Sequence, residues 1–252
     1  MDRNYIKNTI QNLSIKGKWY QGIEIQGIKV PLSKNPIKSE KKYNNACQGK
    51  GKWDNFIKPL IPFKNVKNKT FVELGCNAGL FLILAKKMGF KTVIGIEPNT
   101  ICFKQSQFVK KAYSEINPIY KSIKLLNKKV GTCTYDNKHD NECETLSIDN
   151  IPTADITLLA NVLYWIPMES IKKYVKNILR KKTRYVIVIG LKKGARPKIS
   201  PSSFIDLKLY FEEKWKLIKS ISLEDIQIKK NQKTRDIISM LFKSQLSPSK
   251  GF

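Results

Sequence analysis

Histidine is almost missing from this chain, because His139 is the only one among 252 residues. The five cysteines include no Cys-x-x-Cys pair, so the sequence predicts neither a zinc site nor a disulfide framework. His139 lies in the polar stretch YDNKHDNE, which is typical of a loop. We therefore expect no metal, and a chemistry that does not depend on a histidine base.

Long apolar runs are missing as well. The longest, at 80–85 and 185–190, are far shorter than the roughly 20 residues that a membrane-spanning helix needs. The start MDRNYIKNTI has no apolar core of the kind found in signal peptides. The sequence therefore predicts no contact with a membrane and a cytoplasmic location.

Acidic residues are scarce, since 20 Asp and Glu stand against 47 Lys and Arg, for a net charge of +27. A/T-rich codon usage would account for the many lysines, but not for the shortage of acids. A surplus of this size favours a polyanionic partner held through its phosphates, with RNA or DNA as the leading candidates. A merely solvated basic surface is the alternative.

The stretch at 70–99 reads TFVELGCNAGLFLILAKKMGFKTVIGIEPN. Its pattern predicts a strand over 71–74, a glycine loop, a helix over 80–88 and a second strand over 92–96 that ends on Glu97. This order is typical of units that bind a nucleoside-bearing cofactor at the carboxyl end of a parallel sheet. A site for such a cofactor is therefore expected here.

The loop ELGCNAG suggests which cofactor it is. Gly75 and Gly79 allow a sharp turn and a close approach of a ligand, and Glu97 is placed to accept hydrogen bonds from two ribose hydroxyls. Glu73 and the non-glycine Asn77 make the loop resemble the first motif of class I S-adenosylmethionine (SAM) methyltransferases. That resemblance implies that the acid meets the ammonium of SAM. An NAD site, or glycines for packing alone, are the alternatives. The predicted cofactor-binding residues here are Glu73, Gly75, Cys76, Asn77, Gly79, Glu97 and Pro98.

Strands and helices alternate through the rest of the chain. Asn99 can cap a helix that runs to about residue 115. The other expected helices cover 2–13, 52–60, 168–180 and 202–213. The expected strands are a hairpin within 19–30 and runs at 123–126, 154–160, 184–189, 215–221 and 236–242. This predicts an α/β fold with a Rossmann-like, doubly wound sheet, and the final antiparallel pair fits the seven-stranded methyltransferase sheet. We expect a basic N-terminal extension, 1–62, that packs on a SAM-binding domain, 63–252.

Three further segments make the resemblance more specific. ADITLLANVLYWIP at 154–167 resembles the fourth methyltransferase motif, GKWYQG occupies 17–22, and KWDNFIKPL occupies 52–60. In this order they are similar to the tRNA wobble-uridine 5-oxyacetate methyltransferase family. The three matches cover roughly residues 17–190, and their order is more specific than any one of them.

That family resemblance implies roles for individual residues. It assigns cofactor contact to Lys52 and Tyr164, which in the family serve a carboxylated SAM. A lysine of the family's lead-in is replaced here by Gln21, so ordinary SAM is the expected cofactor and carboxy-SAM the second choice. Asn161, which is also assigned to the cofactor, Tyr164 and Trp165 are expected to frame the acceptor as the catalytic residues.

The function expected from these features is methylation of RNA by SAM, with tRNA favoured. An enolic hydroxyl such as that of 5-hydroxyuridine ionises easily, so a dedicated base is not required. The alternatives are a small-molecule or sugar methyltransferase, a non-catalytic SAM- or RNA-binding module, and a hydride-transfer enzyme. Whether Asp136 or Glu144 bonds the adenine amino group, and the oligomeric state, stay open.

Overall fold

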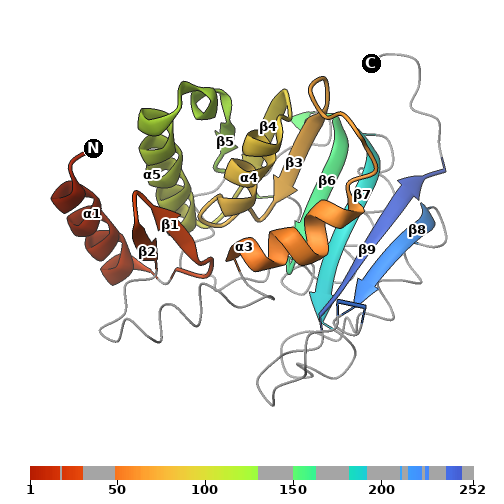
Figure 1. The fold of residues 1–252 in the computed structure, drawn as a ribbon, viewed down its shortest axis with the longest axis horizontal. Coiled ribbons are helices and arrows are strands. Elements are labelled where there is room, and N and C mark those ends of the chain that lie inside the picture. The colour runs from red at the N-terminus through yellow and green to blue at the C-terminus, as the bar shows by residue number, and fades with distance from the viewer. Residues whose placement is uncertain are drawn as a thin grey trace.

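The structure is a computed structural model, drawn in Figure 1. The residues that it describes are 1–17, 19–30, 49–129, 150–162, 182–191, 211, 215–222, 225–226 and 237–245. The helices expected at 168–180 and 202–213 therefore lie outside the described residues, except for the buried Phe211. Among the described residues, no helix is long and apolar enough to cross a membrane.

A seven-stranded sheet forms the centre of the molecule (Figure 1). Its strands are β3 (Thr70–Leu74), β4 (Thr92–Ile96), β5 (Lys124–Leu126), β6 (Ala154–Ala160), β7 (Thr183–Leu191), β8 (Trp215–Ser222) and β9 (Ile237–Ser244). Their spatial order is β5-β4-β3-β6-β7-β9-β8. The pairs from β5 to β7 are parallel, whereas β9 runs antiparallel to both β7 and β8. The predicted seven-stranded α/β sheet with a final antiparallel pair is confirmed.

Local signals explain where the helices begin and end. In the described part of the chain, the α-helices are α1 (Arg3–Lys16), α3 (Gly49–Lys52), α4 (Leu80–Met88) and α5 (Thr100–Ile116). Oδ1 of Asn99 caps α5 by accepting from the N–H groups of Ile101 and Cys102 at 3.0 and 2.9 Å. Gly89 ends α4 in a left-handed conformation, with φ of 105°.

The helix expected at 52–60 is continuous but changes its winding. After α3 the chain forms a π-helical turn, η1 (Trp53–Ile57), and then a 3-10 turn, η2 (Lys58–Leu60). Pro59 has no N–H to donate, so the chain cannot continue as a regular α-helix there. Trp53 packs edge-on against Phe71 and stacks on Phe81, with ring centroids 6.1 and 6.3 Å apart.

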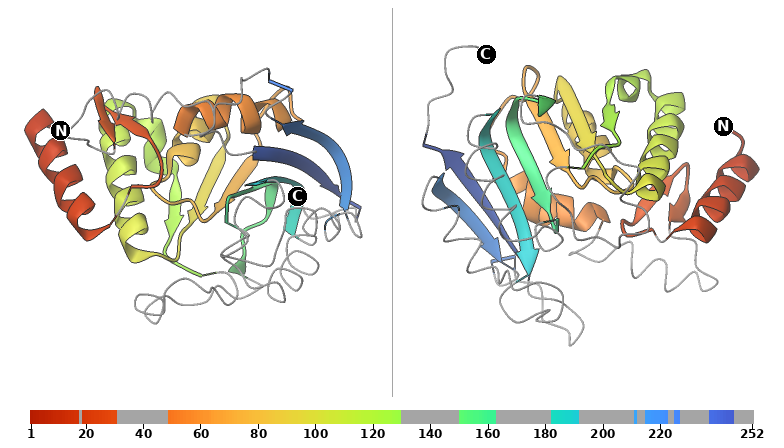
Figure 2. Two further views of the ribbon diagram at one scale, coloured as in Figure 1. Left: turned by 90° about the horizontal axis from the view of Figure 1, so that it is seen from below. Right: turned by 180° about the vertical axis from the view of Figure 1, so that it is seen from behind.

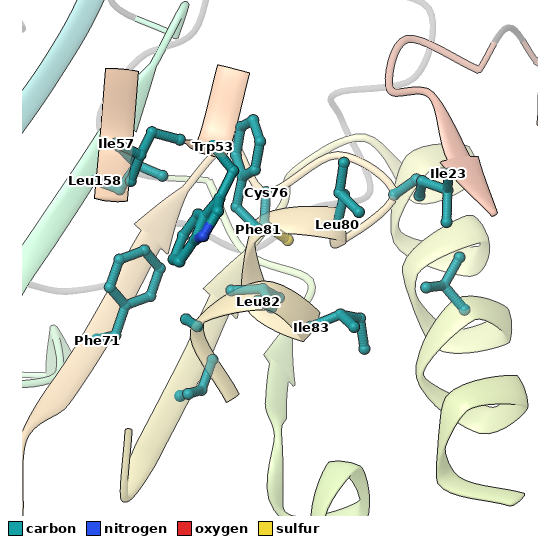
Figure 3. Close-up of a cluster of buried hydrophobic side chains, with 14 of the residues drawn as sticks. Ile23, Trp53, Ile57, Phe71, Cys76, Leu80, Phe81, Leu82, Ile83 and Leu158 are labelled. Atoms are coloured by element: carbon teal, nitrogen blue, oxygen red, sulfur yellow. The ribbon is translucent and has the colours of Figure 1, made fainter. Parts of the chain in front are cut away.

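Both faces of the sheet are apolar. Along β3, Phe71 belongs to one buried cluster, whereas Val72 and Leu74 belong to the other. The elements α3, η1, α4 and α5 lie on the Phe71 side (Figures 1 and 2). Figure 3 shows Trp53, Phe71 and side chains of α4 meeting there. Because successive side chains of a strand alternate, Glu73 faces this side as well.

The N-terminal elements pack on the same side of the molecule. Strands β1 (Ile23–Ile25) and β2 (Ile28–Val30) pair antiparallel, as the hairpin expected within 19–30 requires. The Tyr113 hydroxyl of α5 donates to the Glu24 carbonyl at 2.6 Å. Ile6 and Ile10 of α1 are fully buried. Helix α1 and the β1–β2 hairpin therefore pack on α5 and the buried cluster, while an N-terminal extension that ends at residue 62 stays a prediction.

Candidate functional site

The glycine loop between β3 and α4 lies where the parallel strands end. Gly75, Asn77 and Gly79 all have left-handed backbones, with φ of 68°, 52° and 82°. Glycine adopts this conformation without strain, and asparagine tolerates it better than most residues. The sharp turn expected at Gly75 and Gly79 is present, while their contact with a cofactor stays a prediction. That Asn77 takes the same conformation emerges only from the structure.

Gly75 is also required by its contact with the end of β6. A Cβ on Gly75 would lie 2.8 Å from Cγ2 of Val162. We expect Gly75→Ala to lower the free energy of unfolding by about 2–4 kcal/mol, from backbone strain plus the clash. Gly27→Ala is the matched control, because Gly27 has φ of 78° and a Cβ added there would have no atom within 4 Å; we expect a loss of about 1 kcal/mol. Equal losses in urea denaturation would contradict a role for the Val162 contact.

Every backbone N–H from residue 75 to residue 80 already has an acceptor. The donor–acceptor pairs are Gly75 and Cys76 to the Ile96 carbonyl, Asn77 to Glu97, Ala78 to Asn77 Oδ1, Gly79 to the Cys76 carbonyl, and Leu80 to Gln21. Loops that cradle a pyrophosphate keep such N–H groups for the phosphate oxygens. This arrangement argues against the NAD alternative.

Glu97 fastens the loop to the end of β4. It is 6% exposed, and its Oε2 and Oε1 accept from the N–H groups of Asn77 and Asn99 at 2.7 and 2.9 Å. A carboxylate offers about four acceptor positions, so these two bonds are compatible with ribose hydroxyls as further donors. Contact of Glu97 with a ribose stays a prediction.

Glu73 is the most unusual group of the site. It is 0% exposed, and neither carboxylate oxygen has a hydrogen-bond partner among the described residues. Burial raises the pKa of Glu73 well above its ordinary value; the nearby Glu97 raises it further, and Lys52 opposes both. A buried carboxyl without partners is costly in its charged form. A cationic ligand group beside it would remove that cost.

Asn161 follows β6 at the same edge of the sheet. Its backbone is left-handed, with φ of 58°, and its N–H donates to the Ile189 carbonyl at 2.9 Å. The side-chain Oδ1 is buried without a hydrogen-bond partner among the described residues. It is therefore an acceptor that a ligand N–H or O–H could satisfy. Tyr164 and Trp165, the two other predicted catalytic residues, lie outside the described residues.

The remaining predicted residues also lie at this edge. Lys52 ends α3 close enough to act on the charge of Glu73. Cys76 is 1% exposed, and burial, more than the nearby Glu97, raises the pKa of its thiol, so its side chain is part of the core. The carbonyls of Glu97 and Pro98 accept from Asn127 Nδ2 at 2.8 and 3.2 Å.

Two residues of the site were not assigned to it from the sequence. Asn127 follows β5 and fixes the backbone after β4, and Gln21 accepts from the first N–H of α4 at 3.1 Å. The motif at 17–22 marks Gln21 only as the replacement of a family lysine, and no local pattern gives either residue its present role, because each acts on a segment about 30 or more residues away. Asp136 and Glu144, the candidates for the adenine, lie outside the described residues. No cluster of potential metal ligands occurs in the described part of the chain.

Parts of the chain are similar in sequence to two proteins named tRNA U34 carboxymethyltransferase. No protein-family model matches the chain. Over 117 residues it is 29% identical to the tRNA U34 carboxymethyltransferase of Campylobacter fetus subsp. fetus (strain 82-40), covering 40% of this chain and 39% of that protein. Over 59 residues it is 34% identical to the protein of the same name from Campylobacter hominis, covering 23% and 21%. The match thus spans less than half the length of either relative. The resemblance noted from the motifs is confirmed over these stretches.

Solved structures share the fold over a longer part of the chain. The N-terminal domain of EvdMO1, solved with SAH and D-fucose, aligns with a TM-score of 0.57 at 14% identity, over 97% of this chain and 98% of that one. Magnesium protoporphyrin IX methyltransferase from Synechocystis PCC 6803, solved with SAM, aligns with a TM-score of 0.52 at 13% identity, over 74% and 76%. The chain therefore has the fold of SAM-dependent methyltransferases.

Proposed function

We propose that this chain is a class I SAM-dependent methyltransferase that acts on RNA, with tRNA as the favoured substrate. The observation that carries the cofactor assignment is Glu73, a fully buried carboxyl with no partner among the described residues. The ammonium of SAM would supply the missing charge and hydrogen bonds. The glycine loop supports the same assignment, since its N–H groups are already bonded and leave no cradle for a pyrophosphate.

The residues that we propose to hold SAM include this carboxyl and two charged groups close to it, Glu97 and Lys52. They are Glu73, Gly75, Cys76, Asn77, Gly79, Glu97, Pro98, Asn161 and Lys52. SAM supplies a methyl group on a sulfonium, which is transferred by in-line displacement. The protein then needs mainly to align the acceptor and exclude water. The left-handed glycines allow close approach of the ligand. A cationic donor would favour the ionised form of Glu73 and would be attracted by the two acids, Glu73 and Glu97.

The acceptor side of the proposal rests on charge and resemblance. The net charge of +27 suits a polyanion, and the two relatives carry the name tRNA U34 carboxymethyltransferase. Asn161 would orient the acceptor through its buried Oδ1. Tyr164 and Trp165 would frame the acceptor base, because unpaired bases of RNA are commonly held by stacking on aromatic side chains. A cytoplasmic location fits this function and stays a prediction.

The relatives' name makes carboxymethyl transfer the second candidate. A carboxylated SAM carries an additional carboxylate, which needs cationic or phenolic partners. In the described part of the site Lys52 is the cation beside Glu73, while Gln21 is neutral and its Oε1 is bonded to the helix. An additional carboxylate close to the buried Glu73 and Glu97 would be opposed by these acids wherever they are ionised. Ordinary SAM is therefore the preferred donor.

The function is tested by finding the donor and then the product. We expect mass spectrometry of the protein purified under native conditions to reveal SAM or S-adenosylhomocysteine, and tritiated methyl groups from SAM to appear in bulk tRNA. A co-purifying carboxylated SAM, with transfer of a carboxymethyl group, would favour the second candidate. Absence of SAM binding in calorimetry would contradict both methyl and carboxymethyl transfer. It would favour the alternative of a non-catalytic module.

Salt dependence separates RNA from a small-molecule acceptor. Each phosphate contact to a single strand contributes about −0.7 to the slope of log K against log salt concentration. We expect binding of tRNA to weaken steeply between low and physiological salt, with a slope of about −3 or steeper for four or more contacts. Methyl transfer to a small molecule or sugar should depend little on salt. A flat profile with tRNA would contradict an RNA substrate.

A further inference from the structure

The N-cap residue of helix α4 provides no side-chain acceptor for the first N–H groups of the helix. It begins at Leu80 directly after Gly79, which has no side chain and a φ of 82°. The first N–H groups of any helix lack acceptors within the helix. The acceptor for the Leu80 N–H is Oε1 of Gln21, at 3.1 Å and 59 residues earlier in the chain. Gln21 belongs to the lead-in segment, which comprises Gly17 and residues 19–22.

The lead-in segment is held on both sides of Gln21. The carbonyl of Gly17 accepts from Nε2 of Gln105 in α5 at 3.3 Å. Gly22 lies against the start of α3, because a Cβ on Gly49 would stand 2.8 Å from the Gly22 carbonyl oxygen. The segment therefore connects α5, α4 and α3. Figure 3 shows Ile23, the next residue along the chain, in the apolar cluster that also contains side chains of α4.

We propose that Gln21 is a positioning residue of the cofactor site, which ties the N-terminal extension to the glycine loop by capping α4. The loop is then fixed by two side-chain acceptors from other parts of the chain. Glu97 holds it at Asn77, at 2.7 Å, and Gln21 holds the residue that follows it, Leu80. The consequence for ligand binding rests on the proposed SAM site, whereas the capping contact does not.

The chemistry of capping determines which substitutions are informative. Gln21→Ala removes the acceptor, and Gln21→Lys replaces it by a group that can only donate. Gln21→Glu keeps an acceptor at the same length, and a negative charge is favourable at a helix N-terminus. A capping role therefore predicts that SAM affinity is retained with glutamate at position 21 and is reduced with lysine. A donor contact from Gln21 Nε2 to the ligand predicts that glutamate fails as alanine does.

The experiment measures SAM affinity by calorimetry and amide hydrogen exchange of Leu80, whose N–H is bonded to Gln21, well below the unfolding temperature. We expect Gln21→Ala and Gln21→Lys to weaken SAM binding by about three- to tenfold, as the loss of one hydrogen bond should. Exchange of the Leu80 amide should become faster by a similar factor. Gln21→Glu should stay within about twofold of the wild type in both measurements. Failure of Gln21→Glu to replace glutamine would overturn the proposal.

Tyr113→Phe provides the matched control. It removes the hydroxyl that donates to the Glu24 carbonyl at 2.6 Å, a contact that docks the same extension away from the loop. We expect it to lower the unfolding temperature while leaving SAM affinity and exchange of the Leu80 amide unchanged. If Gln21→Ala gives the same pattern, Gln21 contributes stability only and the proposal is wrong. If the wild type does not bind SAM, the proposed function fails, and hydrogen exchange still decides the capping role.

Discussion

Glu97→Ala is expected to raise the dissociation constant for SAM by about 30- to 100-fold. The substitution removes the carboxylate that accepts from the N–H groups of Asn77 and Asn99 at 2.7 and 2.9 Å. Bonds to a charged acceptor contribute about 1.5–3 kcal/mol each. The glycine loop therefore loses its attachment to β4, and the proposed ribose contacts are lost as well. Isothermal titration calorimetry measures the effect directly.

Two further variants make the Glu97 experiment specific. Glu97→Gln keeps one acceptor oxygen and the shape of the side chain, so its affinity for SAM should lie between those of the wild type and Glu97→Ala. Glu115→Gln removes the charge of an acid at the end of α5 that pairs with the N-terminal ammonium and is 38% exposed. It should leave SAM binding unchanged. Unchanged affinity in Glu97→Ala would mean that the pocket has been placed wrongly.

The second large effect concerns Glu73 and pH. We expect the affinity for SAM to rise with pH, because the raised pKa of Glu73 favours the protonated carboxyl in the empty site, whereas the ammonium of SAM favours the ionised carboxylate. Binding should release protons, which calorimetry in buffers of different ionisation enthalpy detects. Glu73→Gln cannot ionise, so its affinity should be at least about tenfold weaker at neutral pH and independent of pH through this group.

The stability of the ligand-free protein should fall as pH rises, which is opposite to the change in affinity for SAM. The folded-state pKa of Glu73 lies above the ordinary value of 4.5, so between the two values the folded protein binds more protons than the unfolded chain. The free energy of unfolding therefore falls as pH rises through this window, and the loss persists above it. Glu73→Gln removes this penalty and should be more stable than the ligand-free wild type at neutral pH, by about 1–3 kcal/mol.

Asp155→Asn is the control for Glu73→Gln, because Asp155 is an acid with partners. It accepts from the Thr70 N–H at 2.9 Å and lies 3.2 Å from Nζ of Lys69. Removing its charge should lower stability and leave the pH profile of SAM binding unchanged. Stabilisation without loss of SAM affinity in Glu73→Gln would show that the buried carboxyl does not meet the ligand. Urea denaturation and calorimetry at several pH values provide both readouts.

Local sequence patterns determined most of the fold. The strands at 92–96 and 154–160 and the cap Asn99 were predicted where the structure has them. Each depends on the alternation of apolar residues or on a side chain that bonds to its own neighbours, and such signals are complete within a few residues. The same holds for the glycines at 75 and 79, whose spacing predicted a sharply turned loop.

Only the tertiary structure decided how distant segments complete the site. It places β9 between β7 and β8, leaves Glu73 buried without a partner among the described residues, and brings Gln21 to the start of α4. These features depend on which surfaces pack together, and no pattern within a single segment predicts which surfaces do so. A glutamine in a polar lead-in looks the same in sequence whether it is solvated or caps a helix 59 residues later. The sequence predicts which residues form the glycine loop. The burial that raises the pKa of Glu73, and the bond from Leu80 to Gln21, depend on tertiary packing.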